Sequence, residues 1–351
     1  MDQRQRAFLD DLLTTASPSG YETAGQRVWV DYVSEFADEV RTDDYGNAVA
    51  VVEGGDPTVA LAGHGDEIGF IVKRIEEEGF LRIGPIGGAD RTVSKGQHVT
   101  VHADDPVDGV VGQTAIHLRD VGEEEYDDLE AQFVDIGVED AETARELVDV
   151  GDPVTFSTTV AELQGTRVSA RGMDNRVGIW AAAEGLRAAA ESGVDATVCA
   201  VSTVQEEVGL QGAKMVGFDL DPDAAVAIDV THATDSPGIS STKHGDVELG
   251  AGPTVTHGTS NHPQLVERVI EVADAEDIPL QHEPSSRRTG TDTDSIFKTR
   301  SGVPSVLLSV PLRYMHSTVE VADTEDIEHC VQLYAALVRS FGADEEFSVS
   351  L

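Results

Sequence analysis

The chain has 351 residues, with 65 Asp and Glu against 24 Lys and Arg and a formal net charge of −41. This length allows a large core and more than one domain, and the charge disfavours nucleic acid and anionic membranes as partners. The acid surplus and the five lysines are typical of a halophilic protein, because concentrated salt screens repulsion between surface carboxylates. An acidic protein of ordinary origin is the alternative.

Two amphipathic helices are predicted at the start of the chain. Apolar residues at helical spacing place them over 3–15 and 21–37, on either side of the turn-forming segment 17–20. Alternating and β-branched residues then predict three strands. These strands lie near 38–42, 47–53 and 57–63.

The sequence pattern changes over residues 70–166. Short β-rich pieces are separated there by Gly, Asp and Pro, at 70–73, 80–83, 98–102, 109–111 and 153–156. We interpret this region as a small, barrel-like β-rich domain inserted into a catalytic domain formed by 1–69 and 167–351. Its acidic run 123–128 predicts a solvated loop, because like charges repel and stay hydrated.

Helices and apolar strands alternate after Arg171. The predicted helices lie near 175–191, 262–276 and 324–341, with a helix or turn at 210–217, and the predicted strands near 197–204, 224–230 and 304–310. Strands of continuous apolar character are typical of a sheet that is covered on both faces. The fold class predicted is therefore α/β, with a mixed sheet between two layers of helices.

The cysteines and the first residues indicate the cellular compartment. Cys199 and Cys330 lie in apolar segments and are predicted to be buried free thiols. Residues 1–6 enter an amphipathic helix rather than an apolar signal segment, and no apolar run approaches the roughly 18 residues that span a bilayer. We expect a soluble cytoplasmic protein.

Five short segments each place metal-capable side chains at the end of a predicted strand. They are GHGDE at 63–67, GMDN at 172–175, QEEVG at 205–209, AID at 227–229 and YMH at 314–316. Side chains that follow strands in an open α/β sheet converge on one crevice. Imidazoles and carboxylates without a cysteine suit zinc, with cobalt or manganese as alternatives. The segments therefore predict two divalent metal ions and metal-assisted hydrolysis.

Each candidate also has an ordinary structural role as its alternative. His64 taken alone would be a common polar residue, but Asp66 can accept its other ring N–H and fix the tautomer that binds a metal. Asp174 precedes a helix and can serve as its N-cap. Asp229 can belong to a turn, and His316 to a hydrogen-bonded loop.

Glu206 and Glu207 are adjacent acids after an apolar strand. Such a pair is costly near a core unless cations or protons compensate its charge. Neighbouring side chains point in different directions, so one carboxylate can bind a metal while the other accepts a proton from the attacking water. The alternative is that both acids are exposed in a loop.

These segments resemble the TET aminopeptidases, a family of tetrahedral, dodecameric metallo-aminopeptidases related to glutamyl aminopeptidase and once labelled endoglucanases. The resemblance covers nearly the whole chain. The matching segments occur in the family's order, at 64–70, 174–178, 206–212, 229–231 and 313–317. GlyThrAsp at 290–292 is another shared segment, without an assigned chemical role.

The resemblance implies how the candidates divide between two metal ions. Asp174 would bridge them. His64 and Asp229 would complete one site, and Glu207 and His316 the other.

The resemblance also implies the remaining roles and the reaction. Glu206 would be the general base, and Asp66 the acid that orients His64. The expected reaction removes N-terminal residues from short peptides. The β-rich insert is expected to be a dimerisation domain, and the dimers to assemble into a tetrahedral dodecamer.

Other functions stay open from the sequence. A metal-dependent amide hydrolase or deacylase on the same fold would use the same chemistry, whereas a glycosidase would need two carboxylates around a sugar and no metal. A protein that uses metal only for structure is a third class. Arg287 and Arg288 suggest a preference for an acidic substrate residue, with ion pairing inside the protein as their alternative role.

Overall fold

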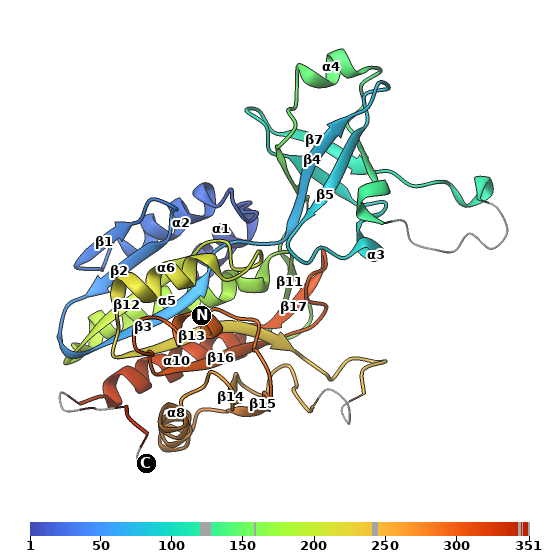
Figure 1. Ribbon diagram of the computed structural model, residues 1–351. Helices are drawn as coiled ribbons and strands as arrows, with labels where there is room; N and C mark the ends of the chain where they lie inside the picture. Colours follow the sequence, from blue (N-terminus) through green and yellow to red (C-terminus); the bar gives the residue numbers. More distant parts are fainter. Residues whose placement is uncertain (120–127, 158, 241–244, 343–344, 346, 350–351) are drawn as a thin grey trace.

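A computed structural model describes residues 1–119, 128–157, 159–240, 245–342, 345 and 347–349. Of the acidic run 123–128, where we predicted a solvated loop, all but Asp128 lies outside the described residues. Figure 1 shows a large α/β body and a smaller β-barrel that stands off one end of it.

A mixed sheet of eight strands forms the centre of the body, as predicted. The four central strands β12, β3, β13 and β16 are parallel, while β1, β2 and β14 introduce antiparallel pairs. All four parallel strands therefore end at the same edge of the sheet. The spatial order is β1 (Glu39–Thr42), β2 (Ala48–Val52), β12 (Ala196–Thr203), β3 (Gly55–His64), β13 (Ala224–His232), β16 (Ser305–Leu312), β14 (Thr254–His257) and β15 (Gln281–Pro284).

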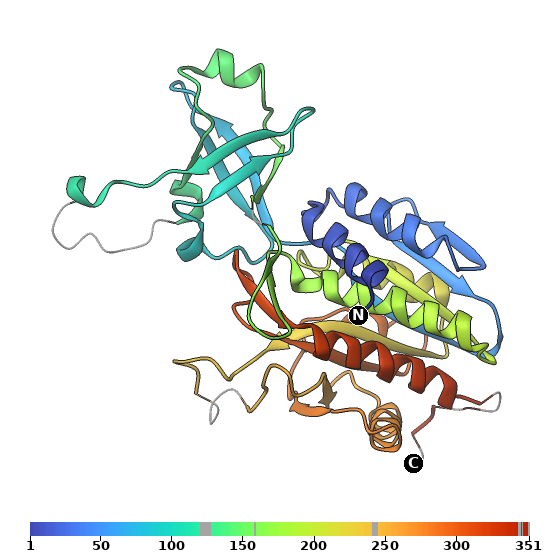
Figure 2. The same cartoon turned by 180° about the vertical axis from the view of Figure 1, so that it is seen from behind.

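Helices cover both faces of this sheet. On β3, Leu61 belongs to the core on one face, and its neighbours Ala60 and Ala62 belong to the core on the other. Figure 2 shows α5 and α10 running alongside each other over the first face. That face carries α1 (Gln3–Thr14), α2 (Thr23–Val33), α5 (Met173–Ser192), α8 (Pro263–Ala275) and α10 (Thr324–Ser340). The second face carries α6 (Gln211–Leu220) and α9 (Thr293–Ile296).

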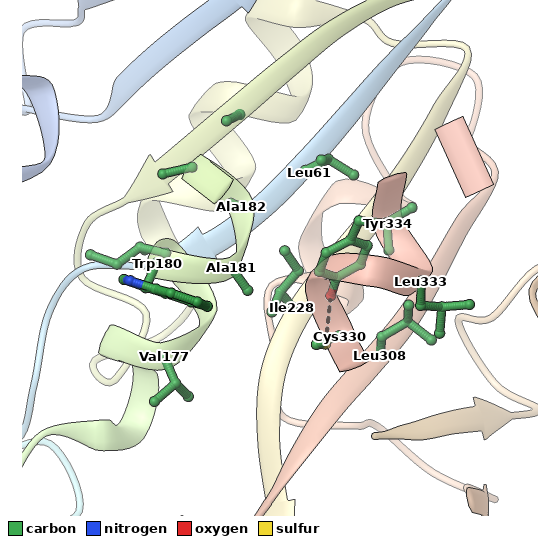
Figure 3. Close-up of a cluster of buried hydrophobic side chains, with 14 of the residues drawn as sticks. Leu61, Val177, Trp180, Ala181, Ala182, Ile228, Leu308, Cys330, Leu333 and Tyr334 are labelled. Atoms are coloured by element: carbon green, nitrogen blue, oxygen red, sulfur yellow. Dashed lines mark hydrogen bonds between the residues drawn. The ribbon is translucent and has the colours of Figure 1, made fainter. Parts of the chain in front are cut away.

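The larger core lies between α5, α10 and the central strands. In Figure 3, Leu61, Ile228 and Leu308 from three neighbouring strands face Tyr334 of α10 and the small side chains of α5. Cys330 donates its thiol proton to Tyr334 Oη at 3.4 Å. Cys199 and Cys330 are both free and buried, as predicted.

The β-rich insert is a closed antiparallel barrel, which confirms the predicted barrel-like domain. It has its own core, in which Phe70, Ile83 and Val154 are almost completely buried. The strand order is β4 (Gly69–Ile75), β5 (Leu81–Ile86), β8 (Phe133–Asp135), β7 (Val107–Val111), β6 (His98–Val101) and β9 (Pro153–Phe156). Short helical turns lie in its loops: α3 (Arg91–Ser94), η1 (Ile116–Leu118), η2 (Leu129–Ala131) and α4 (Ala141–Arg145).

A small sheet lies where barrel and body meet. It consists of β10 (Ala161–Glu162), β11 (Arg167–Ala170) and β17 (Glu320–Asp323) (Figure 1). These strands, like β14 and β15, were not predicted, because segments this short show no clear alternation and depend on pairing with distant strands. Among the described helices, none is long and apolar enough to cross a membrane.

Replacing Leu61 tests the core. Leu61 is fully buried, whereas Leu163 is 45% exposed. Leu61→Ala should lower the free energy of unfolding by about 2–5 kcal/mol because it leaves a cavity. The matched control, Leu163→Ala, should change it by less than about 0.5 kcal/mol. Denaturant titrations at molar salt measure both, and equal shifts would contradict the assignment of Leu61 to the core.

Candidate metal centre

The seven acids and imidazoles singled out in the sequence meet at the edge where the parallel strands end. Three overlapping groups of metal-capable side chains occur there, each with its ligand atoms within 4.8 Å of one another. The residues of these groups are His64 at the end of β3, Asp174 at the start of α5, Glu206 and Glu207 after β12, Asp229 in β13 and His316 after β16. Asp66, in the loop after β3, lies beside His64 but belongs to none of the three groups.

Asp174 lies between the two imidazoles. Its Oδ1 is 3.2 Å from His64 Nε2, and its Oδ2 is 3.3 Å from His316 Nε2. Each oxygen thus faces a different ring, which is the arrangement that a carboxylate needs to bridge two cations. The backbone of Asp174 and Asn175 is not helical, and Asn175 Oδ1, not the Asp174 carboxylate, accepts the hydrogen bond from the Gly178 N–H at 3.0 Å. The alternative role of Asp174 as the helix cap is therefore wrong.

The other acids complete a group around each imidazole. Asp229 Oδ1 is 3.8 Å from His64 Nε2, and Glu207 Oε1 is 3.4 Å from His316 Nε2. A tetrahedral zinc ion with bonds of 2.0–2.2 Å holds its ligand atoms about 3.3 Å apart. The nitrogen and oxygen donors, and most of these spacings, therefore fit divalent ions such as zinc.

Asp66 organises one side of this site. Its carboxylate accepts hydrogen bonds from Ser19 Oγ at 2.6 Å and from the backbone N–H groups of Glu206 and Glu207 at 3.0 and 3.2 Å. His64 Nδ1 lies 3.4 Å from Asp66 Oδ1 and 3.3 Å from its carbonyl oxygen. Because a carbonyl only accepts, Nδ1 carries the proton and Nε2 keeps its lone pair.

Negative charge accumulates in this buried place. Burial, reinforced by neighbouring acids, raises the pKa of Glu206 to about 10 and that of Asp292 to about 7. Burial also raises the pKa of Asp174, but hydrogen bonds from His316 and His64 outweigh it and lower that pKa overall. The hydrogen bonds of His316 with Asp174 and then with Glu207 raise its pKa to about 11. The site therefore requires cations or protons to compensate its carboxylates.

Two buried guanidinium groups are engaged by another acid, Glu67. Arg171 and Arg176 both form ion pairs with Glu67, and the Arg176 Nη2 to Glu67 Oε1 distance is 3.0 Å. All three side chains are almost fully buried. Since Glu67 offsets part of their charge, the two arginines leave the acids of the site without full compensation.

Two buried acids of the site were not among the candidates from the sequence. Asp292 is 2% exposed, and its Oδ2 accepts a hydrogen bond from Thr203 Oγ1 at 2.6 Å. Glu320 accepts from the backbone N–H groups of His316 at 2.8 Å and Asp174 at 3.3 Å. The sequence contained a signal for each of them. Asp292 lies in the shared segment 290–292, and Glu320 is an acid between two valines, a pattern that can indicate a buried carboxylate.

The barrel also reaches the site. Gly88, in the loop after β5, places its carbonyl oxygen 3.1 Å from His316 Nδ1. A small cavity beside Asp174 and His316 has Phe156 of β9 in its wall. No sequence signal identified these contacts, because they join residues as far as 228 positions apart.

Arg287 and Arg288 lie outside this cluster of acids and imidazoles. Both side chains are exposed. Neither forms an ion pair with a carboxylate in the part of the chain that the structure describes, so the alternative of internal ion pairing finds no support there. Their proposed contact with substrate stays a prediction.

Known proteins share this sequence and this architecture. Residues 46–333 match the family model described as M42 glutamyl aminopeptidase. The lysyl aminopeptidase of Pyrococcus furiosus is 36% identical over 338 residues, which cover 94% of this chain and 96% of that protein. A TET aminopeptidase from the marine sediment archaeon Thaumarchaeota archaeon SCGC AB-539-E09 has a TM-score of 0.91 at 33% identity, covering 96% of each chain.

A third relative is known as an assembly. The Pyrococcus horikoshii TET1 peptidase, which can assemble into a tetrahedron or a large octahedral shell, has a TM-score of 0.87 at 32% identity. The match covers 96% of this chain and all 100% of that one. Together with the family match over most of the sequence, these likenesses show that the chain belongs to the M42 glutamyl aminopeptidase family and is a peptide-bond hydrolase.

Proposed function

We propose that the protein is an aminopeptidase that uses two metal ions to remove N-terminal residues from short peptides. Membership of an aminopeptidase family supports the reaction class. The observation that carries the two-metal part is the placement of Asp174, with one oxygen 3.2 Å from His64 Nε2 and the other 3.3 Å from His316 Nε2.

The ions would be held by nitrogen and oxygen donors alone. Asp174, His64 and Asp229 would hold one ion, and Asp174, Glu207 and His316 the other. Two divalent ions so placed lower the pKa of an attacking water and stabilise the negative charge that develops on the peptide carbonyl. This donor set suits zinc first, with cobalt or manganese as alternatives.

Glu206 is the proposed general base. Its Oε2 is 3.9 Å from His64 Nε2, within the acid cluster, and Asp66 holds its backbone N–H. Its carboxylate takes a proton from the attacking water and delivers it to the departing amine. Burial raises the pKa of Glu206, which favours the protonated carboxyl group that forms once the water has given up its proton. Nearby cations would favour the ionised carboxylate before attack. Asp66 would thus position both His64 and the base.

The alternatives differ in what they require of the site. An amide hydrolase or deacylase would share the two-metal chemistry, but its substrate would not need a free α-amine. A glycosidase needs two carboxylates flanking a sugar, and close pairing of buried carboxylates with imidazoles has no part in that chemistry. A purely structural metal site gives no role to a spare acid such as Glu206.

Self-association is a further part of the proposal. The barrel formed within 70–166 would mediate dimerisation, and the dimers would build a tetrahedral dodecamer, as the assembly of the related TET1 peptidase supports. Ile116 and Leu118 of η1 are 73% and 78% exposed and offer apolar surface for such contacts. With a net charge of −41, assembly and activity would depend on molar salt.

Replacing the two adjacent acids separates their roles. Glu206→Gln should keep both ions and reduce kcat about 10²–10⁴-fold, because only the base is lost. Glu207→Gln, the matched change one residue away, should instead lose one ion. Metal analysis after dialysis and peptide turnover at molar salt measure both effects. Wild-type turnover in the Glu206→Gln protein would refute its role as base.

Chelation and blocked substrates distinguish the reaction classes. Removing metal should abolish hydrolysis of free short peptides, and zinc or cobalt should restore it, since the carboxylate and imidazole groups alone cannot activate the water. N-acetylated versions of the same peptides should resist cleavage by the loaded enzyme. Cleavage of blocked peptides at the rate of free ones would favour the deacylase, and sugar hydrolysis that survives chelation would favour the glycosidase.

The stability gained from metal should depend on pH. The pKa values of Glu206, about 10, and Asp292, about 7, exceed the roughly 4 of an unfolded carboxyl group. The folded metal-free protein therefore retains protons that the unfolded chain has released, so it loses stability as pH rises above about 5.

Bound divalent ions replace those protons. At constant free metal, the difference in Tm between loaded and metal-free protein should therefore increase from about pH 5 to about pH 8. Calorimetry measures it, and Glu206→Gln should flatten the dependence because Gln binds no proton. A difference that shrinks with rising pH would contradict this account of the site.

A further inference from the structure

The two imidazoles of the proposed metal sites are held by different parts of the protein. The His64 side chain is 2% exposed, and its Nδ1 faces Asp66 in the same α/β body. The His316 side chain is 32% exposed, and its Nδ1 donates to the carbonyl oxygen of Gly88 at 3.1 Å. Gly88 belongs to the barrel, in the loop that follows β5.

This loop approaches both acidic and imidazole partners of one proposed site. A Cβ atom added at Gly88 would lie 2.7 Å from His316 Nδ1 and 2.9 Å from its Cε1. A Cβ atom added at Gly87 would lie 3.2 Å from Glu207 Cβ and 3.4 Å from its Oε2. The nearest atoms around these two positions come from Ile68, Glu207 and His316, and none from His64 or Asp229.

Close approach, rather than backbone conformation, explains the glycine at position 88. Gly87 has φ 63°, in the left-handed region that favours glycine, but Gly88 is not among the glycines with positive φ. Gly88 is also exposed, so no core packing demands a small residue there. Only the contact with His316 excludes a side chain.

We propose that the Gly87–Gly88 loop is a positioning element for the metal site formed by Glu207 and His316, an inference that rests on the proposed two-metal function. The Gly88 carbonyl accepts the proton of Nδ1, so the ring presents the lone pair of Nε2 to the metal. One of the two ions thus depends on where the barrel lies. The ion at His64 depends on Asp66, within the body that also carries its other ligands.

The first test is Gly88→Ala, read out by metal binding rather than by activity. The added methyl group displaces the His316 ring, so one ion should bind 10- to 100-fold more weakly while the other keeps its affinity, the range typical when a metal-binding histidine loses its partner. Competition with a chelator and metal analysis measure both affinities. Gly84→Ala is the matched control, because the three atoms nearest to its added Cβ all belong to the flexible side chain of Lys73, the closest at 3.1 Å.

A double variant shows whether Gly88 acts through His316. His316→Ala should weaken the same ion, and adding Gly88→Ala should weaken it no further, because the contact is already gone. Asp229→Asn weakens the other site, so combining it with Gly88→Ala should affect both ions. Additive losses from Gly88→Ala and His316→Ala, or equal weakening of both ions by Gly88→Ala alone, would indicate general distortion and overturn the inference.

A second change leaves the loop intact. Replacing His316 with Nδ1-methylhistidine preserves Nε2 and removes the donor to Gly88, and it should also weaken one ion at least 10-fold. If circular dichroism shows that the Gly88→Ala protein does not fold, the methylated variant tests the role of the loop instead. If wild-type protein binds two ions and the methylated variant binds both with unchanged affinity, the inference is wrong while the proposed function stands. Wild-type protein that binds fewer than two ions would refute the proposed function itself.

Discussion

The buried carboxylate of Asp174, held between the imidazoles of His64 and His316, is the interaction on which the rest of the site depends. Other carboxylates surround it, and burial raises the pKa of Glu206 and Asp229 among them. Like charges brought together away from water repel strongly, so the folded chain needs positive charge at this place. The two divalent cations of the proposed function would supply four positive charges and would use the same atoms as ligands. The proposed metal ions would thus compensate the negative charge that the fold gathers at this edge of the sheet.

The sheet gathers this charge by bringing separate chain segments to one edge. β3, β13 and β16 run parallel: His64 is the last residue of β3, Asp229 lies in the second half of β13 and His316 follows the end of β16. Asp66 then links parts of the result, because one carboxylate faces His64 and holds the backbone at Glu206 and Glu207. The positions of His64, a proposed metal ligand, and of the proposed base Glu206 are therefore coupled through a single buried side chain.

The barrel also contributes residues to the site in the α/β body. It has its own core and stands apart from the α/β body, yet its Gly88 carbonyl contacts His316 and its Phe156 lines the cavity beside Asp174 (Figure 1). If the barrel also carries the contacts between subunits, then assembly and the geometry of one metal site share a structural element. The more exposed imidazole is the one that relies on this neighbour, whereas the enclosed His64 has its partner close in sequence.

The sequence by itself determined the mixed α/β fold, the inserted β-rich segment and the seven candidate side chains, because apolar periodicity and acids at strand ends are local patterns. It left open whether Asp174 caps a helix, and only the folded backbone, in which Asn175 accepts the capping hydrogen bond from Gly178, decided against it. The short strands β11 and β17, the buried acids Asp292 and Glu320 and the contact from Gly88 required the tertiary structure. Their roles arise from neighbours up to 228 positions away, and no local pattern records which distant segments the packing of the core brings together.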